Sequence, residues 1–269
     1  MLLIFIINLG LSRAPFSEIH FLLSFSFAMP PEIEIKLPIS NPKSFLRLLH
    51  KLGATPISPR VHEHNLLFDT PDGGLAKHGQ LLRIRTETPA GNTNLPVGVI
   101  RPSATKAKGK KPPSKLPSVR YLLTFKSPPE QLAIVPAASS SNRRHKVREE
   151  LETVLTDASS LQKIFEGLGL RGWFRYEKYR TPYHLPARFK WAKDLLIDFD
   201  ETPIGTFVEL EGPHQAIDLA AHQLGFHPRD FITKNYLVLY LDDCKRQNLP
   251  PSHMLFPRNP TSNRSNTPR

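Results

Sequence analysis

From residue 32 onward, charged and apolar residues alternate along short stretches of the chain. In the first stretch, PEIEIKLPI, Glu32, Glu34 and Lys36 take every second position, and aliphatic residues take most of the positions between them. Successive side chains of a β-strand point to opposite faces of a sheet, so this alternation predicts a strand with all three charges on one face. One such strand is typical of any sheet with a face in water.

The same alternation returns in six further stretches, which draw acids and bases in similar numbers. The alternating positions are Arg83 and Arg85; Thr124 and Lys126; Arg148, Glu150 and Glu152; Lys178 and Arg180; Asp198 and Asp200; and Phe207, Glu209 and Glu211. The opposite faces carry Ile33, Ile35, Leu82, Ile84, Leu123, Phe125, Leu151, Val154, Val208 and Leu210. These apolar faces need covering, so the pattern predicts a curled sheet with helices outside and charges lining a wet interior. An ordinary sheet with one solvated face is the alternative.

Three stretches carry the signals of amphipathic helices that can cover those faces. They are residues 41–53, 157–169 and 213–225. In the first, Asn41 is suited to the N-cap and Gly53 to the C-terminal stop. The second has Asp157 and Gly169 in the same places, and all three have an apolar stripe at helical spacing.

The order of elements repeats along the chain. A charged strand at 32–34 and another at 150–152 are each followed by one of the capped helices and then by a further charged strand. Two similar halves that contribute strands to one interior predict a single α+β domain over residues 30–245. Its expected architecture is a closed antiparallel β-barrel with a pseudo-twofold repeat.

The net charge of +12 lies outside these elements. The Pro-, Ser- and Asn-rich stretches at 88–119, 143–146 and 245–269 hold fourteen of the 36 bases, which leaves 22 bases against 24 acids elsewhere. Such stretches have too few large apolar residues to pack, so we expect a disordered basic insertion over 88–119 and a disordered basic tail over 246–269. They lack interleaved aromatic residues for base stacking, so any polyanion binding should be sequence-blind, and we expect no specific nucleic-acid partner.

The lone Cys244 excludes an intrachain disulfide and a Cys-rich zinc site, and it favours a reducing, cytoplasmic location. Residues 1–28 contain two apolar runs, each too short to span a membrane. The first base, Arg13, lies between the runs, unlike the basic start of a secretory signal. Because Met29 directly precedes the first patterned strand, we expect the native chain to start there, with 1–28 a mis-assigned extension. A cryptic signal or membrane anchor is the alternative, and the oligomeric state stays open.

Nine motifs in order carry a family resemblance. They are Glu-x-Glu-x-Lys at 32–36, FDTP at 68–71, LRIR at 82–85, TFK at 124–126, Arg-x-Glu-x-Glu at 148–152, Glu-Lys-x-Arg at 177–180, Asp200, Gly-x-Phe-x-Glu-Leu-Glu at 205–211 and Thr-Lys-x-Tyr at 233–236. Together they resemble the CYTH domain of the triphosphate tunnel metalloenzymes, which include class IV adenylate cyclases, thiamine triphosphatases and inorganic triphosphatases. The long basic insertion and the two ends depart from the family pattern.

The resemblance implies a small-molecule triphosphate substrate bound by a set of cations. They are Lys36, Arg83, Arg85, Lys126, Arg148, Lys178, Arg180 and Lys234. Arginine forks can grip phosphate oxygens bidentately, and lysines act as point charges. Tyr236 either flanks the phosphates or packs.

Carboxylates that face the same interior would repel the phosphates unless a divalent cation lay between them. These acids are Glu32, Glu34, Glu150, Glu152, Asp200, Glu209 and Glu211. Because their carboxylate oxygens suit Mg²⁺ and Mn²⁺, we expect one of these ions as the cofactor. By resemblance, the pairs Glu32/Glu34 and Glu209/Glu211 are the foremost ligands, and Asp200 follows. Glu32, Glu34 and Lys36, which form the Glu-x-Glu-x-Lys motif, are also the expected catalytic residues. Asp198 joins the set only because it shares the strand face.

Two chemistries can use this arrangement. In a hydrolase, water attacks a terminal phosphorus; in a cyclase, the ribose 3′-hydroxyl attacks the α-phosphorus and expels pyrophosphate. No stretch indicates an adenine pocket, which favours hydrolysis of inorganic tripolyphosphate or an organic triphosphate such as thiamine triphosphate. A class IV adenylate cyclase is the alternative enzyme. A non-catalytic polyphosphate-binding module is the second alternative, although a pure binder gains nothing from carboxylates that repel its ligand.

Overall fold

The computed structural model describes residues 31–90, 119–128 and 144–257. These residues belong to one compact unit that begins at Pro31. Residues 1–28, most of the basic insertion expected at 88–119 and the tail from residue 258 lie outside the described residues, and the expectations for them stay untested. Among the described helices, none has the length and apolar character needed to cross a membrane.

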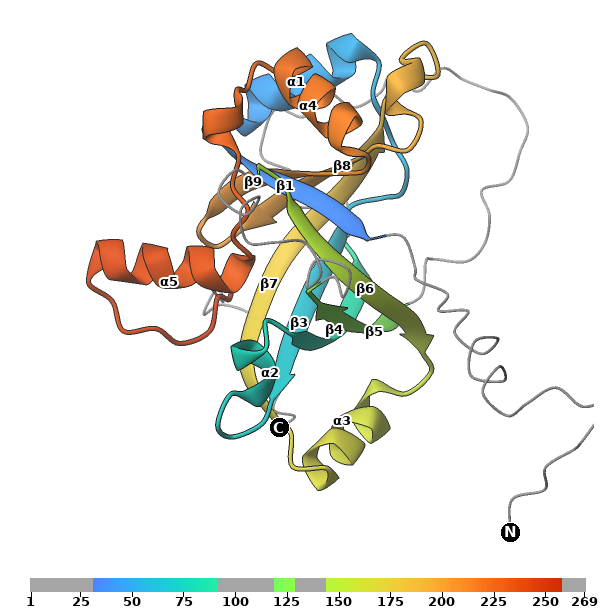
Figure 1. The fold of residues 1–269 in the computed structure, drawn as a ribbon. Helices are drawn as coiled ribbons and strands as arrows, with labels where there is room; N and C mark the ends of the chain where they lie inside the picture. The colour runs from blue at the N-terminus through green and yellow to red at the C-terminus, as the bar shows by residue number, and fades with distance from the viewer. Residues whose placement is uncertain (1–30, 91–118, 129–143, 258–269) are drawn as a thin grey trace, which may run out of the picture. The chain divides into compact units, whose positions relative to one another are not determined.

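Eight strands of the described chain close into an antiparallel barrel (Figure 1). The described strands, of which all but β2 form the barrel, are β1 (Glu32–Ile39), β2 (Thr55–Pro56), β3 (Val61–Asp69), β4 (Leu81–Pro89), β5 (Arg120–Ser127), β6 (Lys146–Leu155), β7 (Arg171–His184), β8 (Leu196–Thr202) and β9 (Gly205–Glu211). Their order around the barrel is β7-β3-β4-β5-β6-β1-β9-β8, and β8 pairs back onto β7. The short β2 pairs with the C-terminal end of β7, at Tyr183 and His184. The closed α+β barrel expected from the alternating charges is confirmed.

The three expected helices form where their caps predict them. The described helices are α1 (Pro42–Leu52), α2 (Gly74–Lys77), α3 (Ala158–Gly167), α4 (His214–Gln223) and α5 (Tyr236–Gln247), with short 3₁₀ turns at Lys190–Ala192 and Pro228–Asp230. Asn41 caps α1 by accepting a hydrogen bond from the backbone N–H of Ser44 at 3.0 Å. Gly53 ends α1 with φ 78°, a left-handed conformation that favours glycine. The pattern analysis did not anticipate α5.

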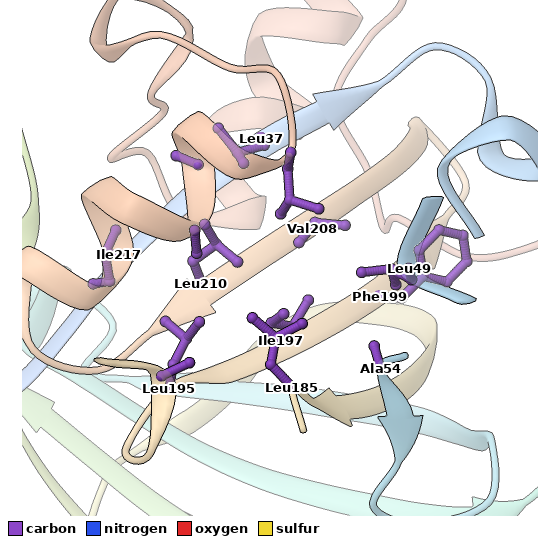
Figure 2. Close-up of a cluster of buried hydrophobic side chains, with 14 of the residues drawn as sticks. Leu37, Leu49, Ala54, Leu185, Leu195, Ile197, Phe199, Val208, Leu210 and Ile217 are labelled. Atoms are coloured by element: carbon purple, nitrogen blue, oxygen red, sulfur yellow. The ribbon is translucent and has the colours of Figure 1, made fainter. Parts of the chain in front are cut away.

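The apolar outer faces of β1, β8 and β9 pack against α1 and α4. Figure 2 shows Leu37, Val208 and Leu210 from the strands gathered with Leu49 of α1 and Ile217 of α4. All five side chains are at most 1% exposed, and burying each contributes about 1.5–3 kcal/mol. This core fixes the outer faces of three strands and therefore the direction of their charged inner faces.

The second helix cover differs from the expectation for β6. Leu151 and Val154 were expected beneath a helix, but they are 56% and 62% exposed. Val154 lies opposite Leu122 and shares its strand face with Glu150 and Glu152, so its assignment to the outer face was wrong. The helix α3, which follows β6, places its apolar side chains against residues of β3 and β4. Its Phe165 lies 5.1 Å from the ring of Phe68 in an edge-to-face contact and joins Ile84 in a separate apolar cluster.

The expectation of a disordered tail from residue 246 is wrong for residues 246–257. After α5, the chain returns to β7, where Met254 accepts a backbone hydrogen bond from Glu177 at 2.9 Å and donates one to Arg175 at 3.0 Å. The Met254 side chain is 1% exposed, and the ring of Phe256 packs 5.1 Å from Tyr179. These two large side chains supply the packing that the Pro-rich composition concealed.

Candidate active site

The inner face of the barrel collects buried polar and charged side chains from most of its strands. Those that are at most 9% exposed include Glu34 and Lys36 of β1, Glu63 and Asn65 of β3, Arg83 of β4, Thr124 of β5, Lys178 of β7, Asp198 and Asp200 of β8, and Glu209 of β9. Because adjacent antiparallel strands keep their inward positions in register, these groups form one continuous charged interior. At one end, it meets an apolar cluster that includes Leu67, Phe174, Phe207 and Met254.

Three neighbouring strands supply an acidic wall. We define the acidic wall as Glu32 and Glu34 of β1, Asp198 and Asp200 of β8, and Glu209 and Glu211 of β9. Glu34 lies opposite Glu211, and Lys36 lies opposite Glu209, in the β1–β9 ladder. The ammonium of Lys36 bridges the wall, 3.2 Å from Glu34 Oε1 and 3.1 Å from Glu209 Oε1.

The acids of this wall divide according to the cations that reach them. Burial alone would raise the pKa of Glu34, but the ammonium groups of Lys36 and Lys146 bring it well below its ordinary value. In contrast, burial raises the pKa of Glu211 to about 8, and the nearby Glu32 carboxylate adds to the shift. Burial also raises the pKa of Asp198 to about 7, although a guanidinium contact opposes the shift. The wall therefore holds more carboxylates than its cations compensate.

A cationic wall stands on the two strands that flank β3. We define it as Arg83 and Arg85 of β4 with Lys178 and Arg180 of β7. Arg180 connects the two walls, because its guanidinium lies 2.5 Å from Asp198 and donates to Asp200 at 2.7 Å. Burial and Arg180 would lower the pKa of Lys178, whereas Asp200 and Glu209 raise it above its ordinary value. Lys178 therefore stays charged inside the barrel.

The other two cations make contacts with residues of β5, β6 and β7. Arg83 donates to the hydroxyls of Tyr176 and Thr124, both at 3.0 Å. Arg85 lies 3.5 Å from Glu152 Oε2. The guanidinium groups are thereby fixed in direction by partners from several strands.

Lysines close the gap between β5, β6 and the acidic wall. Lys126 lies 2.6 Å from Glu32 and 3.1 Å from Glu150. Lys146, at the start of β6, forms an ion pair with Glu34. The sequence analysis had counted Lys146 with the basic, Ser-rich stretches, and its placement in the interior corrects that assignment.

A model of the CYTH domain family matches residues 30–224 of this sequence. The chain belongs to the CYTH family. Among solved structures, a candidate adenylate cyclase from Vibrio parahaemolyticus is 17% identical, with 78% of this chain and 97% of that chain covered and a TM-score of 0.54. A conserved hypothetical protein from Pyrococcus furiosus is 21% identical over 77% and 99% of the two chains, with a TM-score of 0.51. A Pyrococcus horikoshii protein is 19% identical over 79% and 99%, with a TM-score of 0.53.

No curated protein matches the chain. The structural likenesses show the CYTH barrel fold, and the family match places the chain in the triphosphate tunnel superfamily.

Most of the residues that the resemblance implied meet in the CYTH barrel, but Lys234 stands apart. Lys234 is 55% exposed and pairs with Asp242 of α5 at 2.7 Å, away from the interior charges. Arg148 lies opposite Glu32 in the β1–β6 ladder and is half-buried. Tyr236 lies within the cluster, because its hydroxyl donates to Asp200 at 2.7 Å and its ring is 5.0 Å from the Lys178 ammonium.

The sequence reading missed three interior residues: Glu63, Asn65 and Lys146. A usable signal existed, because Glu63, Asn65 and Leu67 alternate along HEHNLLFD as the other inward residues do. The two histidines beside Glu63 concealed that alternation. Lys146 shares its strand face with Arg148, and only the preceding basic stretch concealed it.

The acidic wall is a candidate site for a divalent cation. Among the described residues, no three Asp, Glu, His or Cys side chains lie close enough together to hold a metal ion in their present positions. The donor chemistry nevertheless fits Mg²⁺ or Mn²⁺, which take oxygen ligands. Asp198 Oδ1 is buried without a hydrogen-bond partner among the described residues, and burial raises the pKa of Glu211 because Lys126 offsets it only in part. A cation would bind the free oxygen of Asp198 and add to the partial compensation of Glu211.

Proposed function

We propose that this CYTH chain is a metal-dependent enzyme that hydrolyses inorganic tripolyphosphate or an organic triphosphate such as thiamine triphosphate. The observation that carries the proposal is the separation of a cationic wall from an acidic wall inside one closed barrel. A triphosphate presents about four negative charges in a compact row, which matches the guanidinium and ammonium groups of the cationic wall. The acidic wall then requires Mg²⁺ or Mn²⁺ between its carboxylates and the phosphates.

The residues of the cationic wall bind and orient the phosphate chain. Arg83 and Arg85 present guanidinium groups from one strand, so they can grip neighbouring phosphates and fix the direction of the scissile bond. Lys178 and Arg180 are held by acids of the opposite wall and would exchange Asp200 for phosphate oxygens when substrate enters. The low-dielectric interior strengthens each of these contacts relative to water.

The acidic wall would hold the cation. Glu32, Glu34, Glu209 and Glu211 are the proposed ligands, with Asp200 and Asp198 beside them and Glu150 and Glu152 on the adjoining strand. The bound ion would neutralise phosphate charge and polarise the phosphoryl group. Lys36, placed between Glu34 and Glu209, would keep two of these carboxylates apart and charged.

Product identity tests the proposal against its alternatives. The purified full chain is given tripolyphosphate, thiamine triphosphate or ATP with Mg²⁺ or Mn²⁺, and orthophosphate and cyclic AMP are measured. We expect metal-dependent orthophosphate release from at least one of the first two substrates. Cyclic AMP from ATP would establish a class IV adenylate cyclase instead. Tight polyphosphate binding without turnover under either metal would establish a binding module.

The expected cytoplasmic location, the absence of a specific nucleic-acid partner and the absence of membrane contact remain predictions for this protein.

A further inference from the structure

Six buried polar atoms without a hydrogen-bond partner among the described residues gather on the neighbouring strands β3 and β4. They are Oε1 and Oε2 of Glu63, Nδ2 and Oδ1 of Asn65, and the Nε atoms of Arg83 and Arg85. Glu63 and Asn65 are each 0% exposed. Asn65 lies directly opposite Arg85 on β4 and Tyr176 on β7, so these atoms lie between the two strands that carry the cationic wall.

Another fully buried polar side chain of the same interior does have hydrogen-bond partners. Thr124 is also 0% exposed, yet its hydroxyl accepts from Arg83 at 3.0 Å and donates to Glu152 at 2.9 Å. A buried amide without any partner costs folding free energy, and an apolar side chain of similar shape would avoid that cost. Asn65 and Glu63 therefore need another explanation, and a ligand that completes their hydrogen bonds provides one.

The charges around Glu63 define the chemistry of that ligand. Its carboxylate lies 3.6 Å from Lys178 and 3.7 Å from both Arg85 and Arg180. Burial alone would raise the pKa of Glu63, but these cations hold it well below its ordinary value. The negative charge is thus compensated while the capacity to accept hydrogen bonds is unused. A phosphate placed there would be repelled by the carboxylate, and a cation would be repelled by the surrounding bases.

An uncharged group that donates hydrogen bonds fits these constraints. Its O–H would donate to Glu63, and Asn65 could both donate to and accept from the same group. The Nε–H groups of Arg83 and Arg85 lie on the adjoining strand and would donate hydrogen bonds to the phosphate chain. The subsite therefore suits an oxygen that lies beside a bound phosphate.

We infer that Glu63 and Asn65 form a subsite for an uncharged O–H group next to the phosphate chain: the attacking water in hydrolysis, or a hydroxyl of the substrate in cyclisation. This inference rests on the proposed function. In hydrolysis, the water oxygen forms a bond to the terminal phosphorus, and the bridging P–O bond breaks with its electron pair on the departing diphosphate. One water proton stays on the orthophosphate, and the other ends on the diphosphate. Glu63 accepts a hydrogen bond and orients the attacking oxygen.

Asn65→Leu tests the subsite, with Thr124→Val as the matched control. For Asn65→Leu, we expect kcat for tripolyphosphate to fall about tenfold or more while KM changes less than about threefold, since phosphate contacts remain. Its Tm without ligand should equal or exceed that of the wild type, because an unpartnered amide has been removed. Thr124→Val should lower Tm, because it leaves Arg83 and Glu152 without their shared partner.

Glu63→Gln provides a second variant that preserves shape. Removing the charge frees Arg85, Lys178 and Arg180 for phosphate, so KM should fall together with kcat. If Glu63 were purely structural, Glu63→Gln would not lower KM and kcat together. With ATP as substrate, loss of cyclic AMP in both variants would identify the bound oxygen as a substrate hydroxyl, whereas loss of orthophosphate alone would identify it as water.

Several outcomes would overturn the inference. Full kcat in Asn65→Leu, with an active wild type, would refute the subsite while leaving the proposed function standing. A Tm for Asn65→Leu below that of the wild type, as expected for Thr124→Val, would show that Asn65 is structural. A wild type that turned over none of the three triphosphates would refute the proposed function and, with it, the attacking role of the bound oxygen.

Discussion

The acidic and cationic walls of the barrel differ in how completely their charges are compensated. On the cationic wall, carboxylates from other strands raise the pKa values of Lys178 and Arg85 despite burial. On the acidic wall, Glu211 and Asp198 have pKa values raised to about 8 and about 7, because burial outweighs the cations in reach. The interior is therefore short of positive charge on one side only. A triphosphate alone would deepen that deficit, and the proposed metal ion would offset it.

The largest effect is expected from the acidic wall. Glu32→Gln combined with Glu34→Gln removes two proposed ligands without changing side-chain size, so kcat should fall by about 10³ or more, as for the loss of a major electrostatic contributor. Orthophosphate release under saturating Mn²⁺ measures the change. Circular dichroism and Tm serve as controls for the fold. Activity within about tenfold of the wild type would remove these two glutamates from the site.

A smaller effect, which changes KM as well as kcat, is expected from substitutions in the cationic wall. Arg83→Ala with Arg85→Ala should raise KM and lower kcat, each by about tenfold or more, because these guanidinium groups hold the phosphates and position the scissile bond. Steady-state kinetics with tripolyphosphate over a range of concentrations separates the two constants. A changed KM with an intact kcat would mean that the arginines only hold the substrate.

The excess acids should make the metal-free protein less stable as pH rises. The folded-state pKa values of Glu211 and Asp198 lie above their unfolded values, so the folded protein binds more protons between about pH 4 and 8 and loses stability as those protons leave. Between pH 6 and 8.5, the loss should be roughly 2 kcal/mol or more. Urea unfolding at both pH values measures it. Mn²⁺ should restore more stability at pH 8.5 than at pH 6, and a rise in metal-free stability with pH would contradict the uneven compensation.

The smallest effect is expected from Lys234, which the family resemblance had assigned to the phosphates. Because its ammonium pairs with Asp242 on an exposed surface, Lys234→Ala should change kcat/KM less than about twofold, in keeping with the low value of exposed ion pairs. Lys126→Ala, in the interior, is the comparison variant and should lose far more. A loss at Lys234 equal to that at Lys126 would show that the 233–236 segment moves into the site on substrate binding.

Alternation of charge was sufficient to predict the barrel and most of its interior. Glu32, Glu34 and Lys36 could be assigned to one face because a strand has a period of two, and their apolar neighbours required the cover that α1 and α4 provide. The same rule could not assign Glu63 or Asn65, since His62 and His64 make both faces of that strand polar. Nor could it place Lys234 or Met254, whose positions depend on how the segments around α5 pack, a long-range matter that no local period encodes.

Calorimetric titration of Mn²⁺ into the triphosphate-free protein tests the two-wall assignment most directly. The wild type is compared with the Glu32→Gln/Glu34→Gln pair and with the Arg83→Ala/Arg85→Ala pair at pH 8.5. The account predicts that the glutamine variant binds Mn²⁺ at least about tenfold more weakly, whereas the alanine variant binds it as tightly as the wild type or more tightly, because lost cations leave carboxylates uncompensated. Weakened binding in the folded alanine variant, equal to that of the glutamine variant, would contradict the separation of metal and phosphate between the two walls.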